Sequence, residues 1–425
     1  MLILWLLLAI LATVFVQLLV ANLLHPEKKV ERLLKPDYGL DSPQFRQEVP
    51  SLIGAPILPG NSIELLNNGK EIFPAMLEAI DNAKVSITME TFIYWSGDVG
   101  DRFAEALCRK AKEGVEVKLL IDWVGSKVLG RKEAKKLKDS GVSFEVYRPL
   151  QWRHLWRFNH RTHRKILVVD GVLGFTGGVG IADEWKGDVQ GKDKDHQWRD
   201  THFRLRGPVV AEMQAVFANN WVKATGLLLH GPKFFPKLRA EGNCELQCFH
   251  SSPTEGSESI RVMFLYLIET ASRSLDISAS YFVPDSMLRS ALKRAVARGV
   301  RVRVILPFLN NDTMPVAHAS RYRWGDLLEG GVQIHRFDPT MYHAKAIIAD
   351  GKIASIGSAN FDSRSCRLND EMNINIYDPG FLRVLEQSFE KDLERSTRET
   401  LENWGKRTPR ERLIDRFCSL FETQM

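Results

Sequence analysis

Two stretches of the sequence decide the fold: RTHRKILVVDGVLGFTGG at residues 161–178 and MYHAKAIIADGKIASIGS at residues 341–358. Each indicates a strand, an Asp-Gly turn and a second strand, because β-branched runs flank a dipeptide typical of tight turns. Both contain the pattern H-x-K-x-x-x-x-D, which is expected by chance at about one position in ten thousand. Two copies in matching contexts therefore indicate an internal duplication.

The duplication continues outward from these stretches. In the first half, KVSITMETFIYW (84–95) precedes a helical segment and then AKEGVEVKLLID (111–122). In the second half, RSLDISASYFVP (273–284) precedes a helical segment and then AVARGVRVRVILP (295–307). Short strands that alternate with amphipathic helices are typical of layered α/β proteins. We therefore predict two tandem α/β domains, each a mixed sheet flanked by helices, related by pseudo-twofold symmetry.

The length and local composition suggest how the chain is divided. A chain of 425 residues is long enough for two or three domains, and the Pro- and Gly-containing segment near residues 229–243 is a natural linker. The predicted parts are a transmembrane anchor (1–24), a juxtamembrane linker (25–60), a first domain (61–228), a linker (229–243), a second domain (244–400) and a C-terminal amphipathic helix (401–425).

The N-terminal segment Met1–Leu24 contains no ionisable side chain. A helix of that length spans the roughly 30 Å hydrocarbon core of a bilayer. A cleaved signal peptide is the alternative, but neither its basic start nor its small-residue cleavage site is clear here. Lys28, Lys29 and Arg32 follow the apolar run and nothing positive precedes it, which predicts that the remainder of the chain lies in the cytoplasm.

Two further segments carry apolar side chains that could meet a membrane. At the C-terminus, Leu413, Ile414, Phe417, Leu420 and Phe421 fall on one helical stripe, which predicts a helix packed on its own domain or, alternatively, one lying on a membrane surface. The loop at residues 149–161 interleaves Trp and Phe with Arg. This loop could sit at the membrane interface or pack over the active site.

Composition bounds the partners. The chain is 44% apolar and 26% charged, which excludes a mostly disordered protein, and its net charge of +6 suits a phosphate-bearing partner. The five cysteines are scattered and odd in number, which favours a reducing compartment over a disulfide framework. No metal-ligand array is evident, so we expect neither a metal nor another cofactor.

The doubled pattern supplies the candidate catalytic residues. Because alternate residues of a strand share a face, His163 projects with Lys165 and His343 with Lys345. Two imidazoles and two ammonium groups across an interface would suit a phosphodiester: one His attacks phosphorus, the other protonates the leaving alkoxide, and the lysines stabilise the equatorial oxygens.

Other residues near the two motifs are weaker candidates. Asp170 and Asp350 complete the pattern, but each begins an Asp-Gly turn, so we expect a structural role more than a chemical one. Gly178, Ser358 and Asn360 follow the second strands and are candidates for binding phosphate or substrate, as small residues or neutral donors.

These motifs resemble those of the phospholipase D superfamily, whose signature is a doubled HKD motif followed by GG or GS. The chain is most similar to the bacterial cardiolipin synthases, and the resemblance covers nearly all of residues 50–400. It rests on NHRTHRKILVVDG (159–171), TGGVGIADEW (176–185), QWRDTHFRLRGP (197–208), YFVPDSMLRSAL (281–292), HAKAIIADG (343–351) and GSANFDSRSCRLNDEMN (357–373).

The resemblance implies a mechanism and residue roles. A phosphatidylglycerol forms a phosphohistidine on His163 and glycerol leaves, and a second phosphatidylglycerol resolves the intermediate to cardiolipin, with His343 as general acid and then base. Asp200 and Glu371 are implied as carboxylates that orient the imidazoles. One position departs from the family pattern, because Gly180 stands where an Asn is usual.

Three functions remain open from the sequence. The first is a membrane-bound cardiolipin synthase-like transferase in the bacterial inner membrane, crossing it once. The second is a hydrolase, or a transferase using another lipid such as phosphatidylethanolamine; the third is a catalytically silent scaffold. The intact His-Lys pairs disfavour the scaffold. A nuclease is disfavoured by the modest charge and the apolar N-terminus, so we expect phospholipids and the membrane as partners and no nucleic acid.

Overall fold

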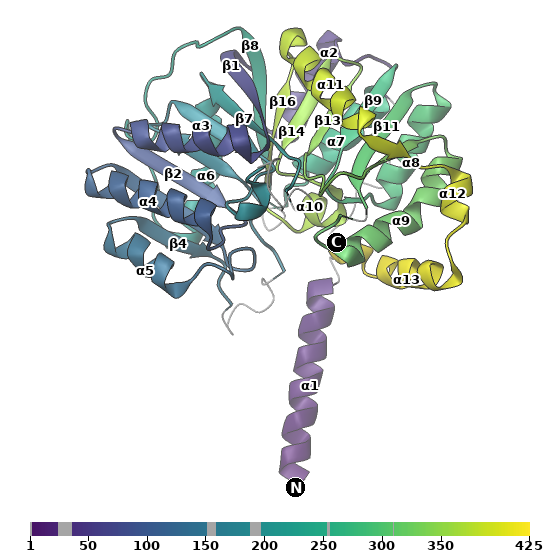
Figure 1. Ribbon diagram of the computed structural model, residues 1–425, viewed down its shortest axis with the longest axis horizontal. Coiled ribbons are helices and arrows are strands. Elements are labelled where there is room, and N and C mark those ends of the chain that lie inside the picture. The colour runs from purple at the N-terminus through teal and green to yellow at the C-terminus, as the bar shows by residue number, and fades with distance from the viewer. Residues whose placement is uncertain (1, 24–35, 151–158, 188–196, 253–255, 309) are drawn as a thin grey trace.

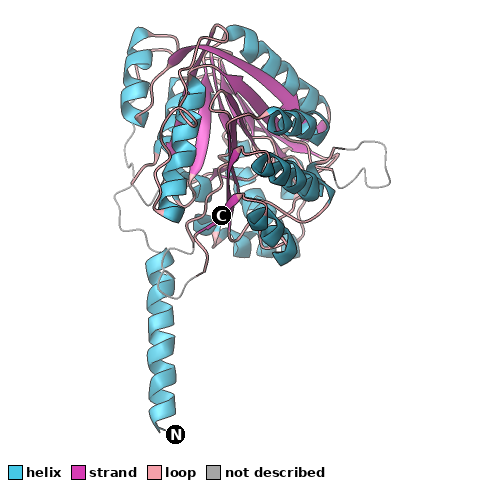
Figure 2. Cartoon of the chain, turned by 90° about the vertical axis from the view of Figure 1, so that its left-hand side faces the viewer, coloured by secondary structure: helices cyan, strands magenta, loops and turns pink. Residues whose placement is uncertain are grey.

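The computed structural model describes residues 2–23, 36–150, 159–187, 197–252, 256–308 and 310–425. The two halves of the chain lie side by side and share one mixed sheet of fifteen strands, with helices on both of its faces (Figures 1 and 2). This confirms the predicted α/β fold of two similar repeats. Residues 151–158, the middle of the loop that interleaves Trp and Phe with Arg, lie outside the described residues.

The strand order displays the duplication. It runs β17-β12-β11-β9-β13-β14-β16-β8-β1-β7-β6-β5-β2-β3-β4, so that the two halves meet where β8 pairs antiparallel with β1. Reading outward from this junction, each strand of one half corresponds to a strand of the other, and β17 is an addition at one edge. The antiparallel pairs β5–β6 and β13–β14 are the two predicted strand-turn-strand units.

The first half contains the following elements in chain order. They are β1 (Leu58–Asn67), α3 (Asn68–Asn82), β2 (Ser86–Thr91), α4 (Asp98–Lys112), β3 (Glu116–Asp122), α5 (Arg131–Asp139), β4 (Ser143–Tyr147), β5 (Ile166–Val169), β6 (Leu173–Gly177), η2 (Asp183–Trp185), β7 (Thr201–Arg206) and α6 (Val209–Thr225).

The second half repeats this order, with the short strands β10 and β15 where the first half has an isolated bridge between Tyr94 and Ile181, and adds β17 at its end. They are β8 (Cys244–Ser251), α7 (Ser259–Thr270), β9 (Ser274–Ser278), β10 (Phe282–Val283), α8 (Ser286–Ala297), β11 (Arg301–Pro307), α9 (Met314–Glu329), β12 (Gln333–Phe337), β13 (Ala346–Ala349), β14 (Ile353–Gly357), β15 (Phe361–Asp362), α10 (Ser363–Arg367), β16 (Glu371–Ile376), α11 (Pro379–Glu394) and β17 (Ser396–Arg398).

The junction between the halves is packed like a protein interior. One buried apolar cluster includes Phe203 and Leu205 of β7 together with Ile356 of β14 and Met372 of β16. All four side chains are buried. Because close-packed apolar surface holds this junction, the relative placement of the two motifs is fixed by the core and not by loops.

The segment predicted as a juxtamembrane linker contains a helix, α2 (Pro43–Ile53). Ser42 caps it by accepting a hydrogen bond from the backbone N–H of Phe45, and Gly54 ends it in the left-handed conformation. Phe45 and Val49 are buried in the core of the second half. The polypeptide therefore contacts the second repeat before it enters the first.

Helix α1 (Leu2–Leu23) stands apart from the two repeats (Figure 1). Among the residues whose placement is described, no helix has both the length and the apolar character needed to cross a bilayer. The predicted transmembrane span is thus not shown by the structure.

The last segment, residues 401–425, forms two helices and a final turn. Helix α12 (Leu401–Gly405) is followed by α13 (Pro409–Ser419) and the 3₁₀ turn η5 (Glu422–Gln424). Thr408 and Glu411 form a capping box at the start of α13, with Pro409 at its first position.

Candidate active site

The two His-Lys pairs lie on the segments that lead into β5 and β13. An isolated bridge joins Thr162 to Asp370, and a corresponding bridge joins Tyr342 to Arg199. The backbone N–H of His163 donates to the Asp370 carbonyl at 2.9 Å, and that of His343 donates to the Arg199 carbonyl at 2.7 Å. Each motif is therefore tied to the loop of the opposite half.

These ties bring each imidazole to a carboxylate of the other repeat. His163 Nδ1 lies 2.9 and 3.1 Å from the two carboxylate oxygens of Glu371. His343 Nδ1 lies 2.7 Å from Asp200 Oδ2. All four side chains are buried. Because Nδ1 of each ring faces a carboxylate, that nitrogen holds the proton and Nε2 keeps its lone pair.

Different donors fix the two carboxylates. Ser358 Oγ donates to Glu371 Oε2 at 2.5 Å, whereas the indole Nε1 of Trp185 donates to Asp200 Oδ2 at 2.9 Å. Gly178 corresponds to Ser358 in the repeat, and a Cβ there would lie 2.2 Å from Asp200 Oδ1. Only glycine leaves room for this carboxylate.

Aromatic rings pack against both imidazoles. Phe92 meets His163 edge to face at 5.2 Å between ring centroids, and Tyr281 meets His343 in the same manner at 6.4 Å. Trp185 and Trp198 each lie 5.2 Å from the His343 ring. Sequence reasoning missed these residues, and Phe92 and Tyr281 are not equivalent in the repeat, because the strand registers match Phe92 with Ser280 and Tyr281 with Ile93.

Burial keeps both imidazoles neutral. Desolvation lowers the pKa of His163 to about 4, although Glu371 opposes the shift. Desolvation and the nearby ammonium of Lys345 lower the pKa of His343 to about 3, against the opposing charge of Asp200. Negative charge brought into the site would reverse part of these shifts by favouring the protonated ring.

The two lysines share the pocket with the imidazoles. Desolvation and the Lys345 ammonium lower the pKa of Lys165 to about 7, and desolvation lowers the pKa of Lys345 to about 8. Lys165 Nζ donates to the His163 carbonyl at 2.8 Å. Lys345 Nζ donates to the His343 carbonyl at 2.7 Å and to Ser280 Oγ at 2.5 Å. The charge of Lys345 reaches Lys165 because the halves face one another here.

The two aspartates of the pattern lie at the far ends of their strands. Asp170 accepts hydrogen bonds from the backbone N–H groups of residues 84–86 at 2.7–3.1 Å. Asp350 accepts from those of residues 272–274 at 2.7–2.9 Å. Both residues adopt positive φ, at 53° and 55°. They join a turn to the start of a neighbouring strand and contact neither imidazole.

The predicted phosphate-binding residues occupy distinct environments. The backbone N–H groups of Gly178 and Ser358 donate to the neighbouring strand carbonyls of Thr201 and Met372. Asn360 is buried and its side-chain oxygen has no hydrogen-bond partner among the described residues. A Cβ on Gly180 would lie 2.9 Å from Ile93 Cβ and 3.0 Å from the Trp185 ring. A side chain at position 180 would therefore require Ile93 and Trp185 to move.

The arrangement defines a class of chemistry. Counting Lys165, Lys345, Asp200 and Glu371 as charged and both imidazoles as neutral, the six groups sum to zero. A bound phosphodiester adds one negative charge, which favours protonating one imidazole while the other keeps its lone pair. A nucleophile and an acid arise together at a buried anion, as phosphodiester group transfer requires.

Comparison with known proteins agrees with this class. The family model described as cardiolipin synthase, phospholipase D-like domain, matches residues 76–185 and 264–393. A cardiolipin synthase of Oceanobacillus iheyensis is 36% identical over 350 residues, which are 82% of this chain and 72% of the relative. The major cardiolipin synthase ClsA of Bacillus subtilis is 37% identical over 350 residues, with the same shares covered.

A solved structure shows the same fold at low identity. The crystal structure of phosphatidylserine synthase from Haemophilus influenzae superposes with a TM-score of 0.70 at 15% identity, covering 89% of this chain and 99% of that chain. The chain belongs to the cardiolipin synthase family of phospholipase D-like enzymes.

Proposed function

We propose that the protein is a membrane-bound phosphatidyl transferase that makes cardiolipin and glycerol from two molecules of phosphatidylglycerol. The observation that carries the proposal is the crosswise pairing of each imidazole with a buried carboxylate of the other repeat. With Nδ1 of each ring held by a carboxylate, the Nε2 atoms of the two imidazoles, one from each half, are left to act on one phosphodiester. The names of the relatives support cardiolipin as the product.

In the first step, the lone pair on His163 Nε2 attacks phosphorus of one phosphatidylglycerol. The bond from phosphorus to the glycerol oxygen breaks, and the proton on His343 Nε2 passes to that oxygen so that glycerol leaves. Lys165 and Lys345 stabilise the charge on the non-bridging oxygens. Glu371 stabilises the positive charge that develops on the His163 ring.

In the second step, neutral His343 takes the proton from a glycerol hydroxyl of a second phosphatidylglycerol. Its oxygen attacks phosphorus, the bond to His163 Nε2 breaks, and cardiolipin leaves with both rings in their starting state. Asp200 keeps the His343 ring oriented through both steps. Water in place of the lipid hydroxyl would give phosphatidic acid, so exclusion of water decides between transfer and hydrolysis.

Several features of the organisation belong to the same proposal. The sequence of residues 1–24, which contains no ionisable side chain, supports a role of this segment as a single-pass anchor. Lys28, Lys29 and Arg32 support a cytoplasmic position for both repeats, at the inner membrane of a bacterium. We retain residues 61–228 and 244–400 as the two domains, with 229–243 between them.

Product analysis tests the function. Detergent-purified protein is incubated with phosphatidylglycerol alone and the lipids are followed by mass spectrometry. We expect cardiolipin and glycerol from the wild type and none from His163→Ala. His230→Ala, which removes an exposed histidine, serves as the matched control and should retain full activity. Phosphatidic acid as the main product would instead identify a hydrolase, and cardiolipin from His163→Ala would contradict the assigned nucleophile.

A further inference from the structure

Helix α13 packs on the protein through its charged face. The carboxylate of Asp415 is fully buried and accepts hydrogen bonds from Arg321 at 2.8 and 2.9 Å and from Arg407 at 2.8 Å. His318 Nδ1 lies 2.8 Å from the same carboxylate. Arg321 and His318 belong to α9, so charge-assisted hydrogen bonds hold the two helices together.

The apolar face of the C-terminal segment is turned to the outside. Leu413, Phe417 and Leu420 follow one another at helical spacing, and their exposed fractions are 69%, 60% and 71%. Phe421 is 49% exposed, and its ring meets that of Phe417 edge to face at 5.6 Å. We call these four residues the apolar ridge. Of the five residues in the predicted stripe, Ile414 is half-buried and these four are exposed, so most of the stripe faces away from the domain.

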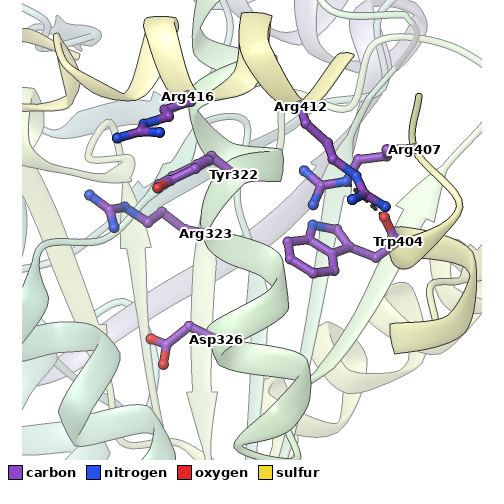
Figure 3. A pocket seen from close by; sticks show the side chains of 7 residues that line it. All are labelled: Tyr322, Arg323, Asp326, Trp404, Arg407, Arg412 and Arg416. Atoms are coloured by element: carbon purple, nitrogen blue, oxygen red, sulfur yellow. Dashed lines mark hydrogen bonds between the residues drawn. The ribbon is translucent and has the colours of Figure 1, made fainter. Parts of the chain in front are cut away.

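A basic hollow of about 560 Å³ is lined in part by Arg412 and Arg416, the sequence neighbours of Leu413 and Phe417 in the ridge. Figure 3 shows the side chains that line it. Figure 3 shows two groups of arginine side chains around it, Arg323 with Arg416 and Arg407 with Arg412. Its lining consists of Tyr322, Arg323, Asp326, Trp404, Arg407, Arg412 and Arg416. We call this the arginine hollow.

Part of the positive charge in the arginine hollow is not neutralised. Arg323 pairs with Glu422, and Arg407 pairs with Asp415 and stacks on the Trp404 ring. Asp326 forms ion pairs with Arg289 and Lys293 of α8. No described residue forms an ion pair with Arg416. The Arg416 guanidinium can therefore still bind an anion in the hollow.

We propose that the apolar ridge and the arginine hollow together form a docking surface for an anionic lipid bilayer. The ridge would enter the interfacial layer while the guanidinium groups bind lipid phosphates, as expected for an interfacial helix with aromatic and leucine side chains beside arginines. Figure 1 shows α13 at the same end of the molecule as α1. A second copy of the chain fits less well, because a twofold pairing would bring like charges together.

The docking surface is connected to the catalytic segment. The chain leaves α13 and ends at Met425, whose carbonyl accepts a hydrogen bond from the Arg364 backbone N–H at 2.8 Å. Arg364 also donates to the carbonyl of Gln424 at 3.0 Å and follows Asn360 in the segment GSANFDSRS. Docking would thus hold the segment that contains Ser358 and Asn360 at a fixed height above the bilayer.

A depth measurement on the full-length protein tests the proposal without relying on turnover. Cys244 and Cys418, the two half-buried thiols, are replaced by Ser, and an environment-sensitive fluorophore is placed at Leu420→Cys. The protein is reconstituted in vesicles of phosphatidylcholine with phosphatidylglycerol, or of phosphatidylcholine alone. A label at Arg383→Cys on α11, at the opposite end of the molecule in Figure 1, is the matched control.

In vesicles with phosphatidylglycerol, we expect lipid-attached quenchers to reduce the emission at position 420 at least threefold more than at position 383. Arg412→Gln with Arg416→Gln should reduce this difference to the level in phosphatidylcholine alone. Equal quenching at both positions would overturn the proposal, as would equal insertion in both lipid mixtures. Concentration-dependent shielding of position 420 in detergent would show that a second copy covers the ridge. Since no outcome depends on activity, the catalytic proposal is tested separately.

Discussion

The crosswise pairing of imidazoles and carboxylates makes a prediction that the order of residues along the chain does not. Glu371 of the second repeat supports His163, so Glu371→Gln should slow formation of the phosphohistidine. Gln has the same shape and can still accept from His163 Nδ1, but it carries no charge. The variant therefore removes the electrostatic contribution while it keeps the hydrogen bond, whose length is 2.9 Å in the wild type.

The size of the effect follows from Coulomb's law. A full positive charge on the ring, centred about 4 Å from the carboxylate, is stabilised by about 4 kcal/mol at an effective dielectric constant of about 20. About half of that charge develops in the transition state, so the loss is about 2–3 kcal/mol when the stronger charged hydrogen bond is included. The rate of the first step should fall about 30- to 150-fold.

The assay separates the two carboxylates. Phosphatidyl-p-nitrophenol carries a leaving group that needs little protonation, so its release reports nucleophilic attack by His163 without help from His343. With this substrate, the burst-phase rate of Glu371→Gln should fall by the full factor of about 30 to 150. Asp200→Asn should stay within about threefold of wild type, and should lose activity about 30- to 150-fold only with phosphatidylglycerol. The opposite pattern would refute the crosswise assignment, and equal losses in both variants would refute the division of roles.

Three other perturbations have defined outcomes. Asp170→Asn removes the negative charge of the carboxylate that accepts hydrogen bonds from the backbone of residues 84–86. We expect the free energy of unfolding to fall by about 2 kcal/mol and the activity per folded molecule to stay unchanged. An inactive variant with unchanged thermal stability would contradict this. Gly178→Ala places a Cβ against the Asp200 carboxylate and should reduce kcat at least tenfold with little change in KM, so wild-type turnover in this variant would contradict the close fit. The pKa values of Lys165 and Lys345, about 7 and 8, predict that kcat/KM falls as pH rises from 7 to 9, because the charged amines are lost above these values. The fall in kcat should begin at higher pH, since the bound phosphodiester favours the charged amines. A flat kcat/KM profile would contradict this prediction.

Much of the fold could be predicted because the signals are local. The two Asp-Gly turns and the β-branched runs beside them specify β5–β6 and β13–β14, and the repeat then specifies the neighbouring strands. The His-Lys pairs follow from the same strands. Asp170 and Asp350 were correctly expected at turns, since Asp tolerates the positive φ that each adopts.

Features that depend on the junction between the halves could not be predicted. Sequence order does not reveal that Asp200 meets His343 and Glu371 meets His163, because this follows from the pairing of β8 with β1. The same limit applies to Trp198, which reaches His343 only across the interface. The orientation of α13 is a different case: an amphipathic stripe gives two faces, and the buried Asp415 shows that paired charges selected the inner one.

The central claim is that His163 carries the phosphatidyl group between donor and acceptor. Protein mixed with phosphatidylglycerol is quenched within a fraction of a turnover under non-acidic conditions, and its peptides are analysed by mass spectrometry. We predict a phosphatidyl adduct on the peptide that contains His163, absent from His163→Ala and present in His230→Ala. An adduct on the peptide that contains His343, or continued turnover with no adduct on either, would contradict the account.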